Sequence, residues 1–510
     1  MGDFHAEMTE GYGFDGPTIG LGRPFVDPAA PVTDVEVRIP LGLLNRHGLI
    51  AGATGTGKTK TLQLLAEQIA AAGTPVFAAD MKGDLAGIGA PGEANDRVTA
   101  RNTELAHAWT PGAASVELLS LSGDTGVPLR ATVASFGPIL LSKVLSLNET
   151  QESSLALVFR YCDDRKLPLL ELEDLRTVLA YLAGPGKDEL EMLGGLSKAT
   201  VGVIQRKVTE LEADGGDAFF GEPELDLRDL LRTTPGGRGV ISVLHLVDVA
   251  ARPALFSTFL MWVLAELFET LPEVGDPDKP TLVFFLDEAH LLFADATKAF
   301  RDSVAQTVRL IRSKGVGVFF VTQLPTDLPD EVLAQLGHRV QHAVRAFTPK
   351  DAKALRQVVQ TYPVTDHYAL DETLQSLGVG EALVTALNPR GVPTPVCATR
   401  IYPPASRMGP LTPEERAAMI ALSSLRPRYA MPVDRESAME ILTAKLNDDR
   451  EREEAAREAA RPAPRREPAR RPKSDDDLLG GIGDLVNSRV AQQVTREVVR
   501  GLFGLLKRRR

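Results

Sequence analysis

Gly52-Ala-Thr-Gly-Thr-Gly-Lys-Thr59 is the stretch of sequence that decides the fold. It matches the phosphate-binding pattern G-x-x-x-x-G-K-[ST] at every position. An apolar, strand-like run (47–51) precedes it, and a helical pattern begins at Thr61. Glycines let backbone N–H groups turn inward around a phosphate, and a helix N-terminus adds partial positive charge. The sequence therefore predicts a P-loop between a strand and a helix.

Each part of this loop receives an expected role. The backbone is expected to surround the phosphates of ATP, Lys58 to reach the β- and γ-phosphates, and Thr59 to ligate Mg²⁺. The candidate nucleotide-binding residues are Gly52, Ala53, Thr54, Gly55, Thr56, Gly57, Lys58, Thr59 and Thr61.

A second acidic group fits such a loop, and the run Thr281-Leu-Val-Phe-Phe-Leu-Asp-Glu-Ala-His290 supplies it. The apolar strand ends in Asp287 and Glu288, which places both carboxylates at the carboxyl edge where nucleotides bind in open α/β sheets. Asp287 is the expected Mg²⁺ partner, and Glu288 is the expected general base for the attacking water. For His290, coupling of the site to a ligand and a structural role both stay open.

Four further residues are candidates, and each has two interpretations. Gln323 directly follows the strand-like run 315–322 and, if the strands are adjacent, could sense the γ-phosphate or orient water; it could also be a strand cap. Arg309 and Arg312 are either solvated helix charges, or one of them, preferably Arg312, crosses a subunit boundary as an arginine finger. Asp80 either borders the nucleotide or a moving strand, or serves the turn Lys-Gly-Asp that follows it.

Composition bounds the class of protein. The 510 residues carry 68 acidic and 57 basic side chains, and 44% of them are hydrophobic, which excludes a wholly disordered or a fibrous chain. The net charge of −11 argues against a generic basic nucleic-acid coat, although a basic channel in an acidic shell is compatible with it. Two cysteines, Cys162 and Cys397, exclude a disulfide framework and a four-cysteine zinc site. The N-terminal residues lack the pattern of a signal peptide, so a cytoplasmic location is expected.

Short apolar runs alternating with helical patterns predict an α/β, RecA-like P-loop NTPase core over 46–129 and 233–400. A short β/loop region, 1–45, precedes it. Residues 130–232 repeat at helical spacing, which predicts a helical insertion; a separate helical domain is the alternative. The expected strands lie at 48–52, 75–80, 239–246, 281–287, 315–322, 339–347, 382–387 and 395–400.

The C-terminal part is expected to differ from the core. Residues 401–447 are an extension that packs on the core, and 448–477 are a disordered linker with too little apolar surface to fold. Its stretch 461–473 holds six cations and one acid, which is interpreted as a solvated tether, with phosphate contact as the alternative. Residues 478–510 are expected to form an amphipathic helix, with packing on protein favoured over a membrane surface.

Taken together, the motifs resemble those of the HerA-like ATPases in the HerA/FtsK group, and more narrowly the bacterial YjgR-type subgroup. The matching blocks are 45–63, 80–88, 285–293, 336–356 and 380–396, within a resemblance over about 15–445. The resemblance implies an additional-strand-catalytic-glutamate fold, a homo-oligomeric, hexameric ring and ATP-driven movement on double-stranded DNA. It also supports Glu288 as base, Gln323 as sensor and Arg312 as a finger acting in trans. Arg339 and Arg345 lie in a matching block without an assigned role.

Two departures shape the functional prediction. The resembled archaeal motors carry an N-terminal β-barrel that docks a nuclease, whereas about 45 residues precede the P-loop here, so the barrel is expected to be absent or vestigial and a nuclease partner is not expected. The tetrapeptide at 287–290 is also typical of superfamily-2 helicases, but their Q-x-x-G-R-x-x-R block is missing from the sequence.

The predicted function is Mg²⁺-dependent ATP hydrolysis by a ring-forming motor that translocates on or unwinds DNA. The alternative is a ring ATPase that acts on protein or at a membrane surface. A slow nucleotide-dependent scaffold is disfavoured by Glu288, because a pure switch needs no base at that position.

Overall fold

The computed structural model describes residues 2–191, 197–213, 215–247, 253–275, 277–293, 298–346 and 348–459. The chain divides into two compact units, 1–447 and 448–510. The expected amphipathic helix at 478–510, and the expected linker from residue 460 onward, lie outside the described residues.

The prediction of a linker from residue 448 is wrong at its start. Helix α17 (Ala438–Ala459) continues twelve residues into that range. Ala, Glu and Arg dominate this stretch and favour helix, and Arg457 lies 3.7 Å from Glu453 at the i,i+4 spacing that supports it. Low apolar content excluded a buried segment there, but it did not exclude an exposed helix.

One mixed β-sheet organises residues 1–447. In the described part of the chain it has twelve strands. In their spatial order, neighbouring strands pair antiparallel along β2, β1, β12, β11 and β10, and they pair in parallel along β10, β3, β9, β8, β4, β7, β5 and β6. From edge to edge the strands are β2 (Val37–Pro40), β1 (Thr18–Pro24), β12 (Cys397–Ile401), β11 (Glu381–Thr385), β10 (His338–His342), β3 (Gly48–Ala51), β9 (Val316–Thr322), β8 (Leu282–Leu286), β4 (Val76–Asp80), β7 (Ile241–His245), β5 (Val116–Ser120) and β6 (Val127–Pro128).

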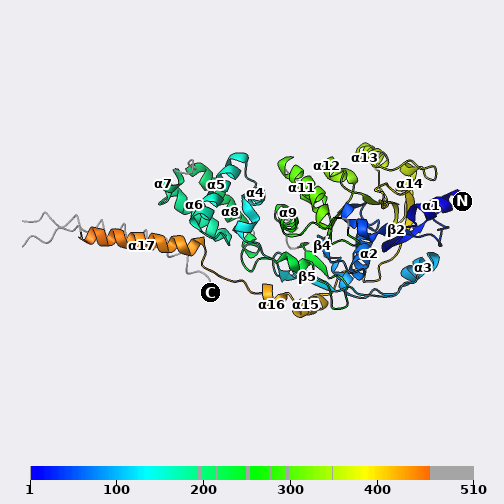
Figure 1. Ribbon diagram of the computed structural model, residues 1–510, viewed down its shortest axis with the longest axis horizontal. Helices are drawn as coiled ribbons and strands as arrows, with labels where there is room; N and C mark the ends of the chain where they lie inside the picture. The colour runs from blue at the N-terminus through cyan, green and yellow to red at the C-terminus, as the bar shows by residue number, and fades with distance from the viewer. Residues whose placement is uncertain are drawn as a thin grey trace, which may run out of the picture. The chain divides into compact units, whose positions relative to one another are not determined.

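The central strands are apolar throughout because both faces of the sheet are covered. In β8, Leu282, Phe284 and Leu286 join one hydrophobic core, whereas Val283 and Phe285 join a second core on the opposite face. Helices α9 (Pro253–Thr270) and α11 (Lys298–Ile311) cover the first face; α1 (Gly2–Tyr12) and α2 (Lys58–Ala71) cover the second (Figure 1).

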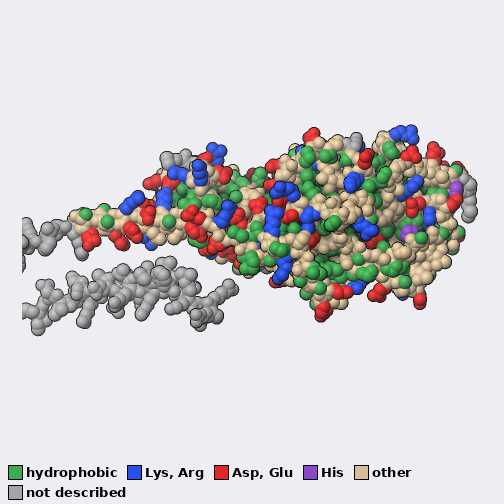
Figure 2. All heavy atoms as spheres, turned by 60° about the horizontal axis from the view of Figure 1, so that its bottom comes forward, with side chains coloured by type: hydrophobic (Ala, Val, Ile, Leu, Met, Phe, Trp, Pro, Cys, Tyr) green, Lys and Arg blue, Asp and Glu red, His purple; other side chains and the backbone are tan. Residues whose placement is uncertain are grey.

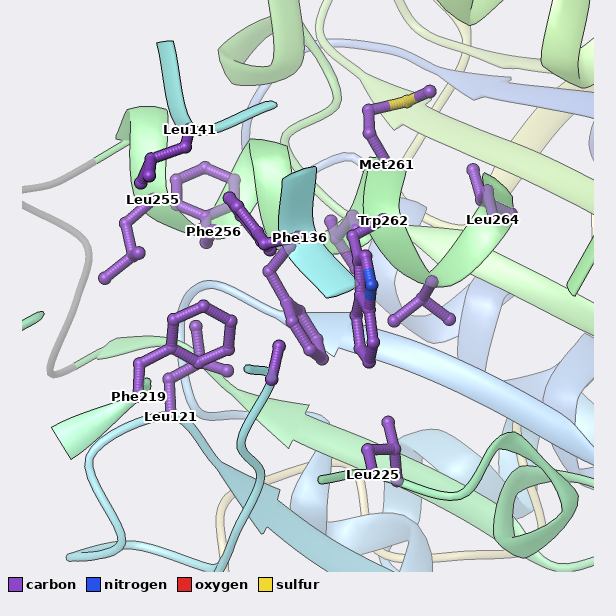
Figure 3. Close-up of a cluster of buried hydrophobic side chains, with 14 of the residues drawn as sticks. Leu121, Phe136, Leu141, Phe219, Leu225, Leu255, Phe256, Met261, Trp262 and Leu264 are labelled. Carbon is purple, nitrogen blue, oxygen red and sulfur yellow. The ribbon is translucent and has the colours of Figure 1, made fainter. Parts of the chain in front are cut away.

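Helices occupy the chain between β6 and β7 and share a core with the sheet. They are α4 (Val133–Val144), α5 (Glu149–Arg165), α6 (Leu172–Ala183), α7 (Lys187–Glu191) and α8 (Lys198–Ala213). Figure 3 shows Phe136 of α4 and Phe219 in the same cluster of buried side chains as Trp262 of α9. The Phe136 and Phe219 ring centroids are 5.7 Å apart, and those of Phe219 and Phe259 are 5.5 Å apart. These helices therefore bury their apolar faces against the same cluster that covers the sheet.

The N-terminal region contains a helix that was not predicted. Residues 1–45 were expected to form a short β/loop region, and β2 lies within it. The structure adds α1, whose Phe4, Met8 and Tyr12 are buried. Strand β5 was also missed, because it follows a stretch rich in Pro and Gly and is only five residues long.

After β12 the chain crosses the outside of the sheet. A segment that we call the strap (residues 402–412) runs along α2, and it is followed by α15 (Pro413–Leu422), which packs on β5. The Glu67 carboxylate of α2 accepts hydrogen bonds from the Ala405 N–H at 2.7 Å and the Ser406 hydroxyl at 2.7 Å. The strap is thus attached to the helix that follows the P-loop. Among the described residues, no helix has the length and apolar character needed to cross a membrane.

Candidate active site

The P-loop leaves the carboxyl end of β3, in the middle of the parallel part of the sheet. Gly52 has φ 151° and Gly57 has φ 117°, which are conformations that favour glycine. A Cβ atom on Gly52 would lie 2.5 Å from Cβ of His342, and one on Gly57 would lie 3.2 Å from the Gly380 nitrogen. The loop can therefore lie this close to β10 and to Gly380 only because these positions have no side chain.

Lys58 is the first residue of α2 and is buried at 6% exposure. Its Nζ donates to the carbonyl oxygens of Gly52 at 2.7 Å and Ala53 at 3.1 Å, so it spans the loop. Burial lowers the pKa of Lys58, the charge of Lys82 adds to this effect, and the carboxylates of Glu288 and Asp287 oppose it. Phosphate oxygens could replace the two carbonyls as partners of this ammonium group. Thr59 follows it and is half-buried.

Asp287 and Glu288 follow β8, which is separated from β3 by β9 alone. Asp287 is buried, and burial raises its pKa to about 6, with Lys82 opposing and Glu288 adding to the rise. Its Oδ1 accepts a hydrogen bond from the Glu288 N–H at 3.0 Å. Glu288 has φ 48°, a left-handed conformation that is uncommon for a residue other than glycine. Both carboxylates therefore lie at the sheet edge that carries the P-loop, as predicted from the strand pattern.

The sequence analysis gave no role to Lys82, whose Nζ lies 2.5 Å from Glu288 Oε1. The register explains the contact, because Ala79 of β4 pairs with Leu286 of the adjacent β8, so the residues just beyond both strand ends meet. Burial acts to lower the pKa of Lys82, but the hydrogen bond to Glu288 and the charge of Asp287 leave it above its ordinary value. The sequence did contain a signal for Lys82, because this cation lies two residues beyond the end of β4, a strand next to β8.

Asp80 and His290 flank this pair. The Asp80 carboxylate accepts hydrogen bonds from the N–H groups of Lys82 at 3.2 Å, Gly83 at 2.7 Å and Leu85 at 3.0 Å. Turn chemistry, one of the two interpretations of Asp80, is therefore present in the structure. His290 Nδ1 lies 3.4 Å from Glu288 Oε2, so this histidine borders the expected base.

Gln323 lies at the same edge, directly after β9. Strand β9 pairs with both β3 and β8, which meets the condition of adjacency on which the prediction for Gln323 depended. Its carbonyl accepts a hydrogen bond from the Gly52 N–H at 3.0 Å, and the residue is exposed. A sensor role for its side chain stays a prediction.

Beneath the loop lies a buried pair that was not foreseen. Thr61 Oγ1 and His342 Nε2 are 2.9 Å apart, and burial lowers the pKa of His342 to about 4. Thr61 also lines a cavity of about 500 Å³ beside Gly57, Lys60 and Arg101. Because the Thr61 hydroxyl is bonded to His342, its contact with a nucleotide stays a prediction. His342 lies in block 336–356, which resembles the HerA-like ATPases, and this resemblance was the signal in the sequence that pointed to it.

Arg312 and Arg309 are not brought to this edge. Arg312 starts the short helix η6 (Arg312–Lys314), and its carbonyl accepts a hydrogen bond from Asn45 Nδ2 at 3.4 Å. Asn45 precedes the amino end of β3, so Arg312 lies at the sheet edge opposite the P-loop. Arg309 is exposed on α11.

Arg339 is half-buried and Arg345 is exposed. Arg339 donates to the Thr361 carbonyl at 3.3 Å, and Arg345 donates to the Gln375 carbonyl at 3.2 Å. These contacts attach the two side chains to the backbone of neighbouring segments and give neither a place in the nucleotide site.

The donor set fits Mg²⁺ bound together with a nucleotide. Within the described ranges, no group of three or more His, Cys, Asp or Glu side chains could hold a metal ion alone. Mg²⁺ usually takes one or two carboxylates and completes its shell with phosphate oxygens and water. Asp287, a buried carboxylate within electrostatic range of Lys58, matches that requirement.

Comparisons with known proteins agree with this geometry. Residues 28–510 match the family model described as helicase HerA-like C-terminal. A relative from Sulfolobus acidocaldarius, named DNA double-strand break repair helicase HerA, is 22% identical over 362 residues, 69% of this chain and 64% of that protein. The protein of the same name from Saccharolobus solfataricus is 23% identical over 357 residues, with the same coverage. The chain therefore spans about 64% of the length of these curated relatives.

A solved structure shares the fold. It is the plasmid coupling protein TrwB in complex with the non-hydrolysable ATP analogue ADPNP, with 15% identity and a TM-score of 0.50 over 78% of this chain and 99% of that one. Motif, sheet topology and family match agree: the chain belongs to the helicase HerA-like C-terminal family and carries a P-loop in a RecA-like α/β fold.

Proposed function

We propose that this chain is the subunit of a ring-shaped motor that couples Mg²⁺-dependent ATP hydrolysis to translocation on, or unwinding of, double-stranded DNA. One observation carries the proposal: the P-loop after β3 and the Asp287–Glu288 pair after β8 lie at one sheet edge, with Gln323 after the strand between them. The curated relatives are named as DNA repair helicases, which supports DNA as the substrate.

The hydrolytic step follows from the side chains at this edge. With a nucleotide bound, Lys58 would exchange the carbonyls of Gly52 and Ala53 for phosphate oxygens, and Asp287 and Thr59 would hold Mg²⁺. The bound metal would supply positive charge where the phosphate oxygens gain negative charge. Glu288 takes the proton of the attacking water, and Gln323 orients that water.

Ring assembly is part of the proposal because Arg312 lies at the edge away from its own P-loop. An arginine placed there can serve a nucleotide only in a neighbouring subunit. Figure 2 shows acidic and basic side chains interspersed on the face that it presents of the described residues. A DNA-binding surface is therefore expected to form where subunits come together, in a channel whose local charge differs from the net −11 of the chain.

The site assignment predicts the loss of ATP hydrolysis in two variants. Lys58→Ala removes the phosphate-binding cation and Glu288→Gln removes the base, and each is expected to lower kcat by about 100-fold or more. Steady-state release of phosphate measures this. Lys207→Ala and Glu210→Gln, which alter an exposed pair 2.8 Å apart, are matched controls expected to leave kcat unchanged. Wild-type turnover in either site variant contradicts the assignment.

The DNA assignment is tested separately by measuring the ATPase rate with and without double-stranded DNA across a salt series. Stimulation that falls steeply with salt is expected, because phosphate contacts release counterions. A rate that does not respond to DNA at any salt concentration contradicts the DNA part and favours a ring ATPase that acts on protein or at a membrane surface.

A further inference from the structure

The expected base is held in an ion pair. Lys82 Nζ lies 2.5 Å from Glu288 Oε1, and the exposed fractions of the two side chains are 43% and 12%. The other oxygen, Oε2, is buried, has no hydrogen-bond partner among the described residues, and faces His290 Nδ1 at 3.4 Å. The carboxylate is therefore engaged by a lysine on one oxygen and enclosed on the other.

This arrangement conflicts with the chemistry that Glu288 is expected to perform. A general base accepts a proton from water through a carboxylate oxygen within hydrogen-bonding reach of that water. Here Oε1 already accepts a hydrogen bond from an ammonium group. A water molecule competes with this ammonium group for Oε1, and opening of the contact with Lys82 frees that oxygen for the water.

We propose that Lys82 is a latch on Glu288: a positioning residue that holds the base in an ion pair until the pair opens and hydrolysis can proceed. The inference rests on the proposed role of Glu288. Lysine suits a latch because its ammonium is carried on a flexible four-carbon stem, and 43% exposure leaves it room to swing into solvent.

The backbone that carries Lys82 is fixed, so the latch opens at the side chain or by a shift of the whole turn. Asp80 binds three N–H groups of the turn. Gly83 has φ 78°, and a Cβ on it would lie 2.9 Å from Nε2 of His245 and 3.2 Å from Val247. The turn is therefore packed against the end of β7.

Contacts of this turn reach both the nucleotide helix and the C-terminal extension. Asp84 lies 3.6 Å from Lys60 of α2. His245 Nε2, against which Gly83 packs, lies 3.0 Å from Arg416 Nη1 of α15. A movement of α2 or α15 therefore reaches Lys82 through contacts present in the structure, and both helices can set how readily the latch opens.

The latch predicts a gain of activity, which a structural role or a direct catalytic role does not. Lys82→Met keeps an unbranched side chain only one atom shorter and removes the charge, and kcat at saturating ATP and Mg²⁺ is expected to rise about fivefold, the rate equivalent of an ion pair worth about 1 kcal/mol. KM for ATP is expected to stay within about twofold, because the change acts after binding. Lys82→Arg keeps a cation and is expected to show less than half of that gain.

The matched control is Lys207→Met. Lys207 is 39% exposed and lies 2.8 Å from Glu210, so it loses a similar ion pair away from the site. Its kcat is expected to equal that of the wild type. The double variant Lys82→Met/Glu288→Gln is expected to be as inactive as Glu288→Gln, because the gain passes through Glu288.

Unchanged or lower kcat in Lys82→Met overturns the latch, and so does a gain that persists in the double variant. A thermal unfolding midpoint close to that of the wild type checks that Lys82→Met folds. The proposed function fails separately: it fails if Lys58→Ala and Glu288→Gln turn over normally. If those two variants are inactive and Lys82→Met shows no gain, only the latch is wrong.

Discussion

At the scale of single residues, His47 shows how burial fixes a protonation state. It lies at the amino end of β3 at 2% exposure, and its Nδ1 accepts a hydrogen bond from the Val318 N–H at 3.0 Å. A ring nitrogen that accepts from a backbone N–H carries no proton, so this imidazole is neutral. Burial lowers the pKa of His47 to about 3, and the charge of Arg312 acts in the same direction.

This lowered pKa gives stability a defined pH dependence. Below the ordinary histidine pKa of about 6.5 the unfolded chain takes up a proton at this position, while the folded chain does so only near pH 3. Folding therefore loses stability as pH falls through this window. Relative to His47→Gln, which keeps an acceptor, the wild type is expected to lose about 2 kcal/mol more between pH 7 and pH 5.

Urea unfolding of both proteins at pH 7, 6 and 5 measures that difference. The raised pKa of Asp287 acts in the opposite sense, because a carboxyl group that keeps its proton more tightly when folded favours folding at low pH. It does so equally in both proteins, and the comparison cancels it. Parallel stability curves would show that His47 takes up protons equally in the two states.

The same scale shows what the sequence could and could not predict of the site. Lys58 and Asp287 belong to local patterns, a motif and a strand end, that can be recognised without knowledge of the fold. Lys82 and His342 acquire their roles only through pairing between distant segments: β4 beside β8, and β10 beside β3, which is nearly 300 residues away along the chain. Strand order, which single-sequence patterns do not give, was the missing information.

At the scale of elements, the strap depends on glycines that let backbones approach. A Cβ on Gly87 would lie 1.9 Å from the carbonyl oxygen of Gly409 in the strap. Gly112 also borders the strap, but the nearest atom to a Cβ there is 3.6 Å away, in Ala405. Both glycines adjoin the strap, but only Gly112 has room for a side-chain methyl group.

Gly87→Ala is therefore expected to destabilise the protein by about 1–3 kcal/mol, because backbone cannot yield as a flexible side chain can. Gly112→Ala, with ordinary van der Waals contact, is the matched control and is expected to change stability by less than about 0.5 kcal/mol. The free energy of unfolding in urea at pH 7 measures both changes. Equal stabilities for the two variants would show that the strap moves aside at no cost.

Elements were predictable where their signal was strong and local. The central strands, such as β8 and β9, are apolar runs bounded by polar residues, and the prediction found them. Helix α1 was missed although Phe4, Met8 and Tyr12 recur every four residues, because the surrounding glycines suggested a loop. The continuation of α17 beyond residue 447 was missed because an exposed helix carries no apolar stripe.

At the scale of the whole molecule, the position of Arg312 bears on assembly. Its carbonyl contacts Asn45 at the amino edge of the sheet, whereas Lys58 and Glu288 lie at the carboxyl edge. A head-to-tail ring can bring the amino edge of one subunit to the nucleotide of the next, because such an interface joins two different surfaces. Arg312 is too far from the P-loop of its own subunit to act there, but in such a ring it would face the nucleotide of the neighbouring subunit.

Mixing two inactive variants tests this arrangement. Arg312→Ala is expected to lower kcat about 1,000-fold, as loss of an arginine finger does, whereas Arg309→Ala, one helical turn earlier, is expected to stay near the wild-type rate. An Arg312→Ala subunit has an intact P-loop, and a Lys58→Ala neighbour still offers Arg312. In one-to-one mixtures about a quarter of the sites combine both, so up to about a quarter of the wild-type rate is expected to return. If ATPase assays recover no activity at any mixing ratio, Arg312 does not act across a subunit boundary.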